Sequence, residues 1–153
     1  MDQPVQSLTV KLLLADYAVA TEGKITIVGG GWRNTLPMSA IMAIGGTVEI
    51  PWTETNRRHH LRIALVRQDG QAVRIATPIG EQAFELQGAF EAGRPPGVPP
   101  GTSFTMPLAL SFVRPQLEVG TYVFDVFVGD ARKASLPFDV LEQLNTPHPR
   151  PPG

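Results

Sequence analysis

Apolar residues recur at every second position along most of the chain, from about residue 8 to residue 140. In residues 121–128, for example, the even positions are Tyr, Phe, Val and Val. Successive side chains on a β-strand point to opposite faces, so this spacing is typical of a strand with one face on a core. The pattern recurs in about nine segments, and no comparable stretch has helical spacing. The sequence therefore predicts an all-β fold with little or no helix.

Glycine and proline residues separate these segments and predict the turns between them. Glu22-Gly23, Asp69-Gly70 and Gly129-Asp130 each fit a tight hairpin turn. Gly45-Gly46 falls inside a segment, where paired glycines indicate a bulge or bend. The predicted strands lie within residues 8–14, 25–27, 42–50, 61–65, 73–75, 84–90, 104–112, 121–128 and 133–140.

Several short strands without intervening helices favour an antiparallel β-sandwich of about eight to nine strands. We expect Greek-key connections and an immunoglobulin-like arrangement. Gly120-Thr121-Tyr122, at the start of a strand, resembles the tyrosine corner of immunoglobulin-like folds. Pro107 and Pro137 each lie within a strand, and because proline cannot donate to a strand ladder, both predict edge strands.

The length of 153 residues suits a single domain. We place the β-sandwich at residues 7–146, preceded by an N-terminal arm of residues 1–6 and followed by a proline-rich tail of residues 147–153. The composition of the tail favours neither helix nor central strand, so we expect it to become ordered only against a partner. Residues 93–101 contain four prolines and predict an exposed loop with polyproline character.

Composition and charge exclude several classes of site and partner. The chain has no cysteine, which excludes disulfides, thiolate metal sites and cysteine nucleophiles. Its net charge of −1 provides no general attraction to nucleic acid or to anionic membranes. The N-terminus lacks the order of a signal peptide, and the nearby apolar run Leu12 to Ala15 is too short to span a bilayer. We therefore expect a cytoplasmic protein, or a virion protein if the chain is phage-associated.

Gly29, Gly30 and Gly31 raise the question of a phosphate-binding loop. Such a loop needs a helix after the glycines, and residues 32–37 show neither a helical pattern nor a Gly-Lys-Ser/Thr sequence. Close backbone packing, or a turn with positive φ, is the favoured interpretation.

The densest basic cluster, residues 57–62, contains two adjacent histidines. On a strand His59 shares the Leu61 face and His60 points away, so the two cannot easily bind one metal ion. We expect no metal site and no cofactor. Two interpretations of the cluster stay open: an exposed strand start, and a contact for an anion or a protein partner.

Catalysis by a serine nucleophile needs a serine, a histidine and a carboxylate to converge. The Gly-x-Ser-x-Gly pattern is absent, and the carboxylates occur singly, mostly in the polar phase of strands. We therefore expect that the protein is not an enzyme. The remaining enzymatic hypothesis is a hydrolase using Asp16, His60 or Asp125, and it requires these side chains to lie within hydrogen-bond reach of each other.

Trp32 and Trp52 are better candidates for recognition, because both follow strand ends in surroundings rich in glycine or proline. Tryptophan beside arginine has the composition of an interface hot spot. The alternative is that each tryptophan caps an open end of the core. The candidate binding residues are Trp32, Arg33, Trp52, Arg57, Arg58, His60 and Arg94.

Three motifs carry a family resemblance: Leu-Leu-Leu-Ala-Asp-Tyr-Ala at 12–18, Gly-Gly-Gly-Trp at 29–32, and Pro-Trp-Thr-Glu-Thr-Asn at 51–56 with His60. With these motifs the chain resembles an uncharacterised bacterial family, common in actinobacteria and known only as a domain of unknown function. The similarity continues through residues 93–97 and 120–122 to Pro137-Phe138. The resemblance implies a small, single-domain cytosolic protein without assigned activity or cofactor, and it assigns no catalytic residue.

The sequence favours a non-enzymatic module that binds a protein partner or a second copy of itself, through the Trp32, Trp52 and Arg57-Arg58 region and the proline-rich loop. A specific form is a phage- or virion-associated accessory protein of the capsid decoration type, with residues 1–6 and 147–153 as arms. In that form, deleting residues 147–153 is expected to weaken assembly without lowering the melting temperature. The alternative is a small-molecule or carbohydrate binder with a tryptophan as stacking platform.

Overall fold

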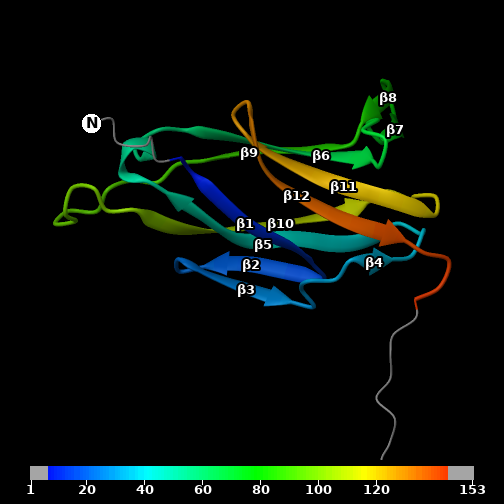
Figure 1. Cartoon of the computed structure of the whole chain (residues 1–153), viewed down its shortest axis with the longest axis horizontal. Coiled ribbons are helices and arrows are strands. Elements are labelled where there is room, and N and C mark those ends of the chain that lie inside the picture. Colours follow the sequence, from blue (N-terminus) through cyan, green and yellow to red (C-terminus); the bar gives the residue numbers. More distant parts are fainter. Residues whose placement is uncertain (1–6, 145–153) are drawn as a thin grey trace, which may run out of the picture.

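The computed structural model describes residues 7–144, so both expected arms, residues 1–6 and 147–153, lie outside the described residues. Within that range the chain forms twelve strands and one 3₁₀ turn, η1, and the all-β prediction is confirmed (Figure 1). The elements are β1 (Thr9–Ala15), β2 (Tyr17–Thr21), β3 (Lys24–Val28), β4 (Asn34–Thr35), β5 (Ala40–Ile50), η1 (Trp52–Glu54), β6 (His59–Arg67), β7 (Arg74–Thr77), β8 (Gly80–Ala83), β9 (Glu85–Phe90), β10 (Phe104–Arg114), β11 (Gly120–Val128) and β12 (Ala131–Val140).

Two sheets pack face to face around the main core. One has the strand order β1-β5-β10 and the other the order β4-β12-β11-β6-β9, and every pairing in them is antiparallel except β4 with β12. The alternating apolar residues of both sheets meet between them, with Ile44, Leu65 and Phe124 fully buried. Each such side chain contributes about 1.5–3 kcal/mol when it is removed from water. The two-residue rhythm therefore identified the faces that form the core.

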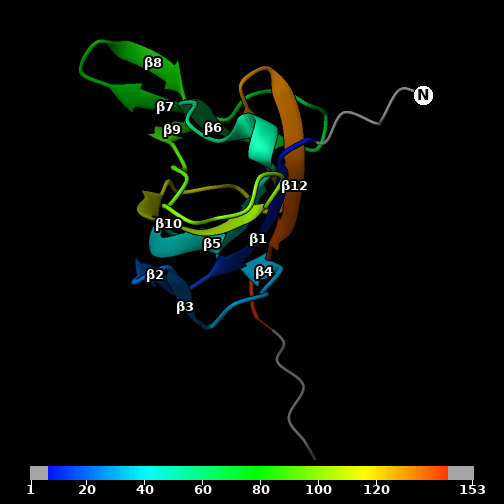
Figure 2. The same ribbon diagram turned by 90° about the vertical axis from the view of Figure 1, so that its left-hand side faces the viewer.

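The hairpin β2–β3 covers the outer face of the three-stranded sheet (Figures 1 and 2). Its turn has positive φ at both Glu22 and Gly23, as a type I′ hairpin turn requires. Ala18 of this hairpin packs so closely that a Cβ on Gly45 would lie 2.7 Å from the Cβ of Ala18. The bulge predicted at Gly45-Gly46 is wrong, because β5 pairs in unbroken register with both neighbours there. The glycines instead allow close packing of the hairpin and of β1.

The two packed sheets contain eight strands, as the prediction of eight to nine allows, and the other four strands form two small hairpins. Three strands lie outside the predicted segments, because they carry almost no alternation. β4 has only two residues, and β2 and β8 are mostly exposed strands of small hairpins. β7 and β8 form a hairpin that projects from the body of the sandwich (Figure 1). The turn at Asp69-Gly70 is present, with φ of 88° at Gly70, but the chain then leaves the sheet for this hairpin.

The edge-strand prediction is confirmed for the strand with Pro107 and is wrong for the strand with Pro137, which has a neighbour on each side. β10, with Pro107, is an edge strand of its sheet. β12 has a second neighbour, β4, only at Asp139 and Val140, so Pro137 lies where β12 is paired on one side. The Tyr122 hydroxyl donates a 2.8 Å hydrogen bond to the carbonyl of Glu118, which is the contact of a tyrosine corner. The immunoglobulin-like, Greek-key arrangement stays a prediction.

Strand β5 defines the two ends of the sandwich. Its eleven residues span about 33 Å, from Ala40 at one end to Ile50 at the other. We call the end where β5 begins the Trp32 end, and the end where β5 leads into η1 the Trp52 end. None of the described residues forms a helix long and apolar enough to cross a membrane.

Candidate functional site

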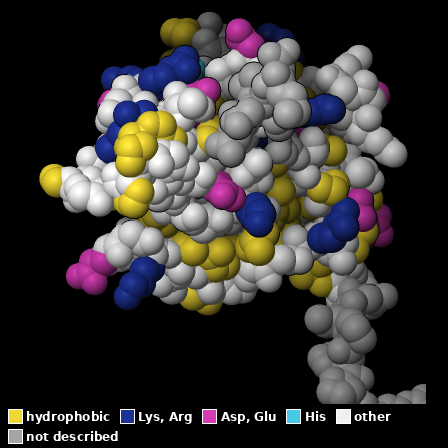
Figure 3. All heavy atoms as spheres, turned by 60° about the vertical axis from the view of Figure 1, so that its left-hand side comes forward, with side chains coloured by type: hydrophobic (Ala, Val, Ile, Leu, Met, Phe, Trp, Pro, Cys, Tyr) yellow, Lys and Arg dark blue, Asp and Glu magenta, His cyan; other side chains and the backbone are white. Residues whose placement is uncertain are grey.

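The candidate binding residues divide between the two ends of the sandwich and do not form one contact. Trp32 and Arg33 lie at the Trp32 end, where the chain approaches β4 and the start of β5. The other five, Trp52, Arg57, Arg58, His60 and Arg94, lie at the Trp52 end with the proline-rich loop. On the face shown in Figure 3, which brings the left-hand side of Figure 1 forward, hydrophobic side chains reach the surface in patches between charged ones.

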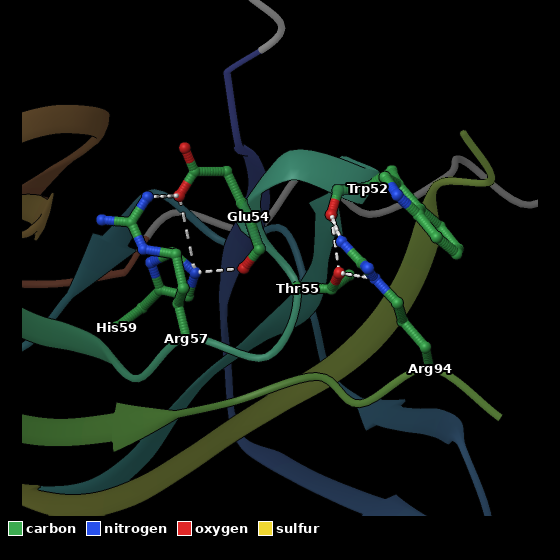
Figure 4. Close-up of polar contacts among 6 residues, drawn as sticks. All are labelled: Trp52, Glu54, Thr55, Arg57, His59 and Arg94. Atoms are coloured by element: carbon green, nitrogen blue, oxygen red, sulfur yellow. Dashed lines mark hydrogen bonds and ion pairs between the residues drawn. The ribbon is translucent and has the colours of Figure 1, made fainter. Parts of the chain in front are cut away.

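At the Trp52 end, one face of the Trp52 ring is occupied by Arg94 of the same chain. The Arg94 guanidinium carbon lies 3.7 Å from the ring centroid. Its Nε donates to Thr55 Oγ1 at 2.5 Å, and one terminal nitrogen donates to the Trp52 carbonyl at 2.7 Å (Figure 4). Thr55, which is buried, in turn donates to the same carbonyl at 2.6 Å. Arg94 therefore anchors the proline-rich loop to η1.

Glu54 binds two residues of the basic cluster (Figure 4). Its carboxylate lies 3.2 Å from Arg57, and its carbonyl lies 2.8 Å from Nε2 of His59. His59 also stacks on Phe90, with ring centroids 5.3 Å apart, and so shares the inward face as predicted. Arg58 and His60 are exposed. Among residues 7–144, no group of three or more His, Asp or Glu side chains could hold a metal ion.

Replacing Arg94 with alanine is expected to lower the free energy of unfolding by about 1–2 kcal/mol, because it removes a cation–π contact and two hydrogen bonds from a charged donor. Urea unfolding measures the loss. Arg58→Ala is the matched control, since Arg58 is exposed and makes no side-chain hydrogen bond among the described residues. Equal losses in the two variants would contradict the anchoring role of Arg94.

At the Trp32 end, Gly29, Gly30 and Gly31 fold tightly against the end of β1. A Cβ on Gly29 would overlap the Asp16 carboxylate, and φ is positive at Gly29 and Gly31. The Gly31 amide donates to the Leu14 carbonyl at 2.7 Å. The next element is strand β4, not the helix that a phosphate cradle needs. The arrangement supports the packing interpretation of the triple glycine.

Trp32 packs on the core and also lines a cavity. Its ring meets Phe138 edge-on, with centroids 6.1 Å apart. Its indole N–H is buried and has no hydrogen-bond acceptor among the described residues. Trp32 is half-buried and caps the core, whereas a role for it in recognition stays a prediction. The cavity, which we call the Trp32 groove, has a volume of about 290 Å³ and is lined by Asp16, Trp32, Asn34, Thr35, Leu36, Met38, Ser39, Ala40, Ile41, Met42, Arg114 and Leu144.

Arg33 does not line the Trp32 groove but a second cavity beside it. This smaller cavity, of about 180 Å³, is also lined by Trp32 and is bordered by Leu13 and Pro137. The Arg33 carbonyl accepts a 2.7 Å hydrogen bond from the Asp139 amide, which holds the segment beside β12. Arg33 thus lies next to the Trp32 groove without lining it.

Arg114, at the end of β10, is buried beneath the groove with 1% of its surface exposed. Its guanidinium donates to the carbonyls of Leu36 and Met38, both at 2.7 Å, and to that of Pro115 at 2.9 Å. Burial lowers the pKa of Arg114 below its ordinary value, and Tyr122 opposes this shift. The residue fixes the 36–38 segment, which forms a wall of the groove.

Large apolar side chains are exposed around the Trp32 groove. Met38, Ile41 and Leu144 line the groove and are 63%, 76% and 50% exposed. Val113 lies opposite Ile41 across β5 and β10, and Tyr17, which pairs with Val28, follows directly after Asp16. We call this set the apolar cluster; its members are Tyr17, Val28, Met38, Ile41, Val113 and Leu144.

The sequence analysis missed the apolar cluster, although part of its signal is visible. Ile41 and Val113 fall in the outward phase of strands whose inward residues were identified as core. Arg114 departs from the pattern in the opposite way: it is a charged residue at an inward position of β10, where an apolar residue is expected. Apolar residues out of phase at the same end of two paired strands predict an exposed apolar surface there. Asp16 and Leu144 carry no comparable pattern.

The three residues of the hydrolase hypothesis do not converge. Asp125 accepts a 2.7 Å hydrogen bond from Ser135 on the outer face of β11 and β12. Asp125 lies opposite Ala64 of β6, and His60 lies four residues before Ala64 on the same strand. His60 and Asp125 are therefore separated by about 13 Å along the strand direction. Asp16 lies at the Trp32 end. The geometry that this hypothesis requires is not present among these side chains.

Comparison with known proteins gives a family but no activity. A family model described as "Family of unknown function (DUF6941)" matches residues 11–141. The chain belongs to this family. No curated protein matches it. The DUF6941 match includes the tryptophans of both ends, whereas Leu144 lies beyond it. Because the description of DUF6941 names no activity, a function for the chain has to be argued from its own geometry.

Proposed function

We propose that this domain is a non-enzymatic binding module that acts through protein–protein contacts at the Trp32 end. The observation that carries the proposal is the apolar cluster, which holds six of the nine large apolar side chains that are exposed among the described residues. Monomeric soluble proteins seldom expose contiguous apolar patches, and where they do the patch often marks an interaction site. The remaining three side chains, Leu13, Ile79 and Val119, do not belong to the cluster.

The chemistry around the apolar cluster resembles the composition of a protein interface. Trp32 presents an aromatic surface at the groove, and Met38 provides a flexible apolar side chain. Asp16, Asn34 and Ser39 surround them with polar groups. Arg114 holds the groove wall, so the surface is largely preorganised, and preorganisation reduces the entropic cost of binding. A phage- or virion-associated accessory role is a narrower form of the proposal and rests on fold-level analogy alone.

The Trp52 end is less suited to this role. One face of Trp52 is covered by Arg94, and the Arg57 and His59 side chains already contact Glu54. A partner at this end would have to displace interactions within the chain. The sequence analysis expected one contact formed by Trp32, Trp52 and Arg57-Arg58 together. We instead propose that the contact is at the Trp32 end alone.

Site-specific photo-crosslinking in cells of the source organism tests the proposal. A benzophenone side chain at position 41 is expected to give a discrete adduct with protein, and the Val113→Ser substitution should reduce it, since Val113 lies opposite Ile41. Position 79, at the tip of the β7–β8 hairpin, is the matched control, because Ile79 is 82% exposed against 76% for Ile41. Adducts of equal yield from both positions, or none from position 41, would refute a specific contact.

A small-molecule binder is the second candidate, favoured by the volume of the Trp32 groove. At about 290 Å³ the groove lies at the lower limit of ligand pockets. The version with Trp52 as a stacking platform is less favoured, because Arg94 already occupies one face of the ring. Saturable quenching of Trp32 fluorescence by a member of a fragment library, measured in a Trp52→Phe background, would support this candidate, and absence of any saturable response would remove it.

A further inference from the structure

We propose that the Trp32 groove binds the proline-rich segment 147–153 of a second copy of this chain, so that two copies exchange their C-terminal segments. The inference rests on the proposed function, because it names the partner of the same site. Three observations support it: the aromatic and apolar lining of the groove, the position of Leu144 in that lining, and an uncompensated carboxylate at the groove.

The lining of the groove fits a proline-rich ligand. Four of the residues 147–152 are proline, a composition that favours the polyproline II conformation. Segments of this kind dock on grooves lined by aromatic side chains. Because they are already extended and stiff before binding, they lose little conformational entropy when they bind. In the groove, Trp32 provides the aromatic surface, with Met38 and Ile41 beside it.

Charge favours the same pairing. The Asp16 carboxylate lines the groove and forms no ion pair among residues 7–144. Arg114, the other charged group of the groove, directs its guanidinium to three backbone carbonyls. The segment 147–153 carries one arginine, Arg150, and no carboxylate side chain. An approach of Arg150 to Asp16 brings opposite charges together at the edge of an apolar contact, where they increase specificity and the association rate.

The apolar cluster indicates that the ligand comes from a second copy. Leu144 lines the groove, and only Asn145 and Thr146 separate it from Pro147 in the sequence. Exchange of the segments about a two-fold axis brings the Trp32 ends of two copies together and covers the apolar clusters of both. Docking within one chain provides no second Trp32 end to cover these exposed side chains.

Analytical ultracentrifugation of three forms of the chain tests the inference: the full chain, a variant lacking residues 147–153, and a variant lacking residues 1–6 as matched control. The full chain and the control are expected to form dimers with similar affinity. Deleting residues 147–153, or substituting Arg150→Glu, should weaken dimerisation at least tenfold, with the native fold verified by circular dichroism.

A peptide of residues 145–153 provides an independent readout. Added to the chain that lacks residues 147–153, it is expected to shift the indole N–H resonance of Trp32 in a saturable way, with the resonance assigned by a Trp52→Phe variant. A peptide with alanine in place of its prolines should not do so. Binding of the native peptide together with a monomeric full chain would overturn exchange in favour of docking within one chain.

Failure of this inference is distinguishable from failure of the proposed function. A dimer that survives deletion of 147–153 overturns the exchange, and so does the absence of both dimer and peptide binding. In either case the crosslinking from position 41 still decides whether the apolar cluster contacts another protein. If the exchange holds and the only adduct from position 41 is a dimer of this chain, the groove serves only the chain's own segment, and a wider binding role is excluded.

Discussion

Replacing Phe138 with alanine is expected to lower the free energy of unfolding by about 3–5 kcal/mol, the range for loss of a large aromatic side chain from a core. Phe138 is 1% exposed and stacks on Tyr122 and Phe124, with ring centroids 5.7 and 5.3 Å away. Trp32 meets its edge at 6.1 Å. The substitution removes the ring that all three aromatic side chains contact, and its neighbours belong to rigid strands that can close the cavity only in part.

Urea unfolding measures the Phe138 effect, and Phe127→Ala is the matched control. Phe127 lies on the outer face of the same strand pair, where the Arg62 guanidinium lies 4.2 Å from its ring centroid. Its loss should cost about 1 kcal/mol or less. In the Phe138 variant, Trp32 emission should also shift to longer wavelength, because Trp32 loses its packing partner. Similar losses in the two variants would mean that the assignment of inner and outer faces is wrong.

The alternation of apolar residues was sufficient to predict the main sheets. It located β5, β6, β10, β11 and β12, because each has one face on the core and one face toward solvent or toward small residues. It could not locate β2 or β8, whose side chains bury little on either face. The role of Gly45 was also beyond it. Only the packing of Ala18 against the sheet explains why a side chain is excluded there.

The candidate sites were predicted by residue type and not by position in space. Trp52 and Arg94 were both named, but their contact joins residues 42 positions apart, and no local pattern reveals that the arginine covers the ring. The Trp32 groove is assembled from four separate parts of the chain, around Asp16, Trp32 to Met42, Arg114 and Leu144. Trp32 was identified because tryptophan beside glycine is conspicuous. Ile41 was detectable only as an apolar residue in the outward phase.

Replacing Arg114 with alanine is expected to cost about 3 kcal/mol of stability. Each hydrogen bond from a charged donor contributes about 1.5–3 kcal/mol, and Arg114 donates three, to the carbonyls of Leu36, Met38 and Pro115. The cost of burying the guanidinium offsets part of that gain, and this same burial lowers the pKa of Arg114. The carbonyls would be left facing an apolar gap. Arg132→Ala is the control, since Arg132 is exposed and its nearest carboxylate oxygen, on Asp125, is 4.0 Å away.

The Arg114 variants also separate charge from volume. Arg114→Met keeps most of the side-chain volume but has no hydrogen-bond donor, so it should lose nearly as much stability as Arg114→Ala. Arg114→Lys should lose less, because its ammonium group can still donate to some of the three carbonyls. Urea unfolding gives the three values, and the Trp32 indole resonance reports on the groove wall. If Arg114→Met were as stable as the native chain, the hydrogen bonds would be incidental and packing alone would hold residues 36–38. If it is destabilised while Arg132→Ala is not, a buried cation without a carboxylate partner fixes the shape of the groove.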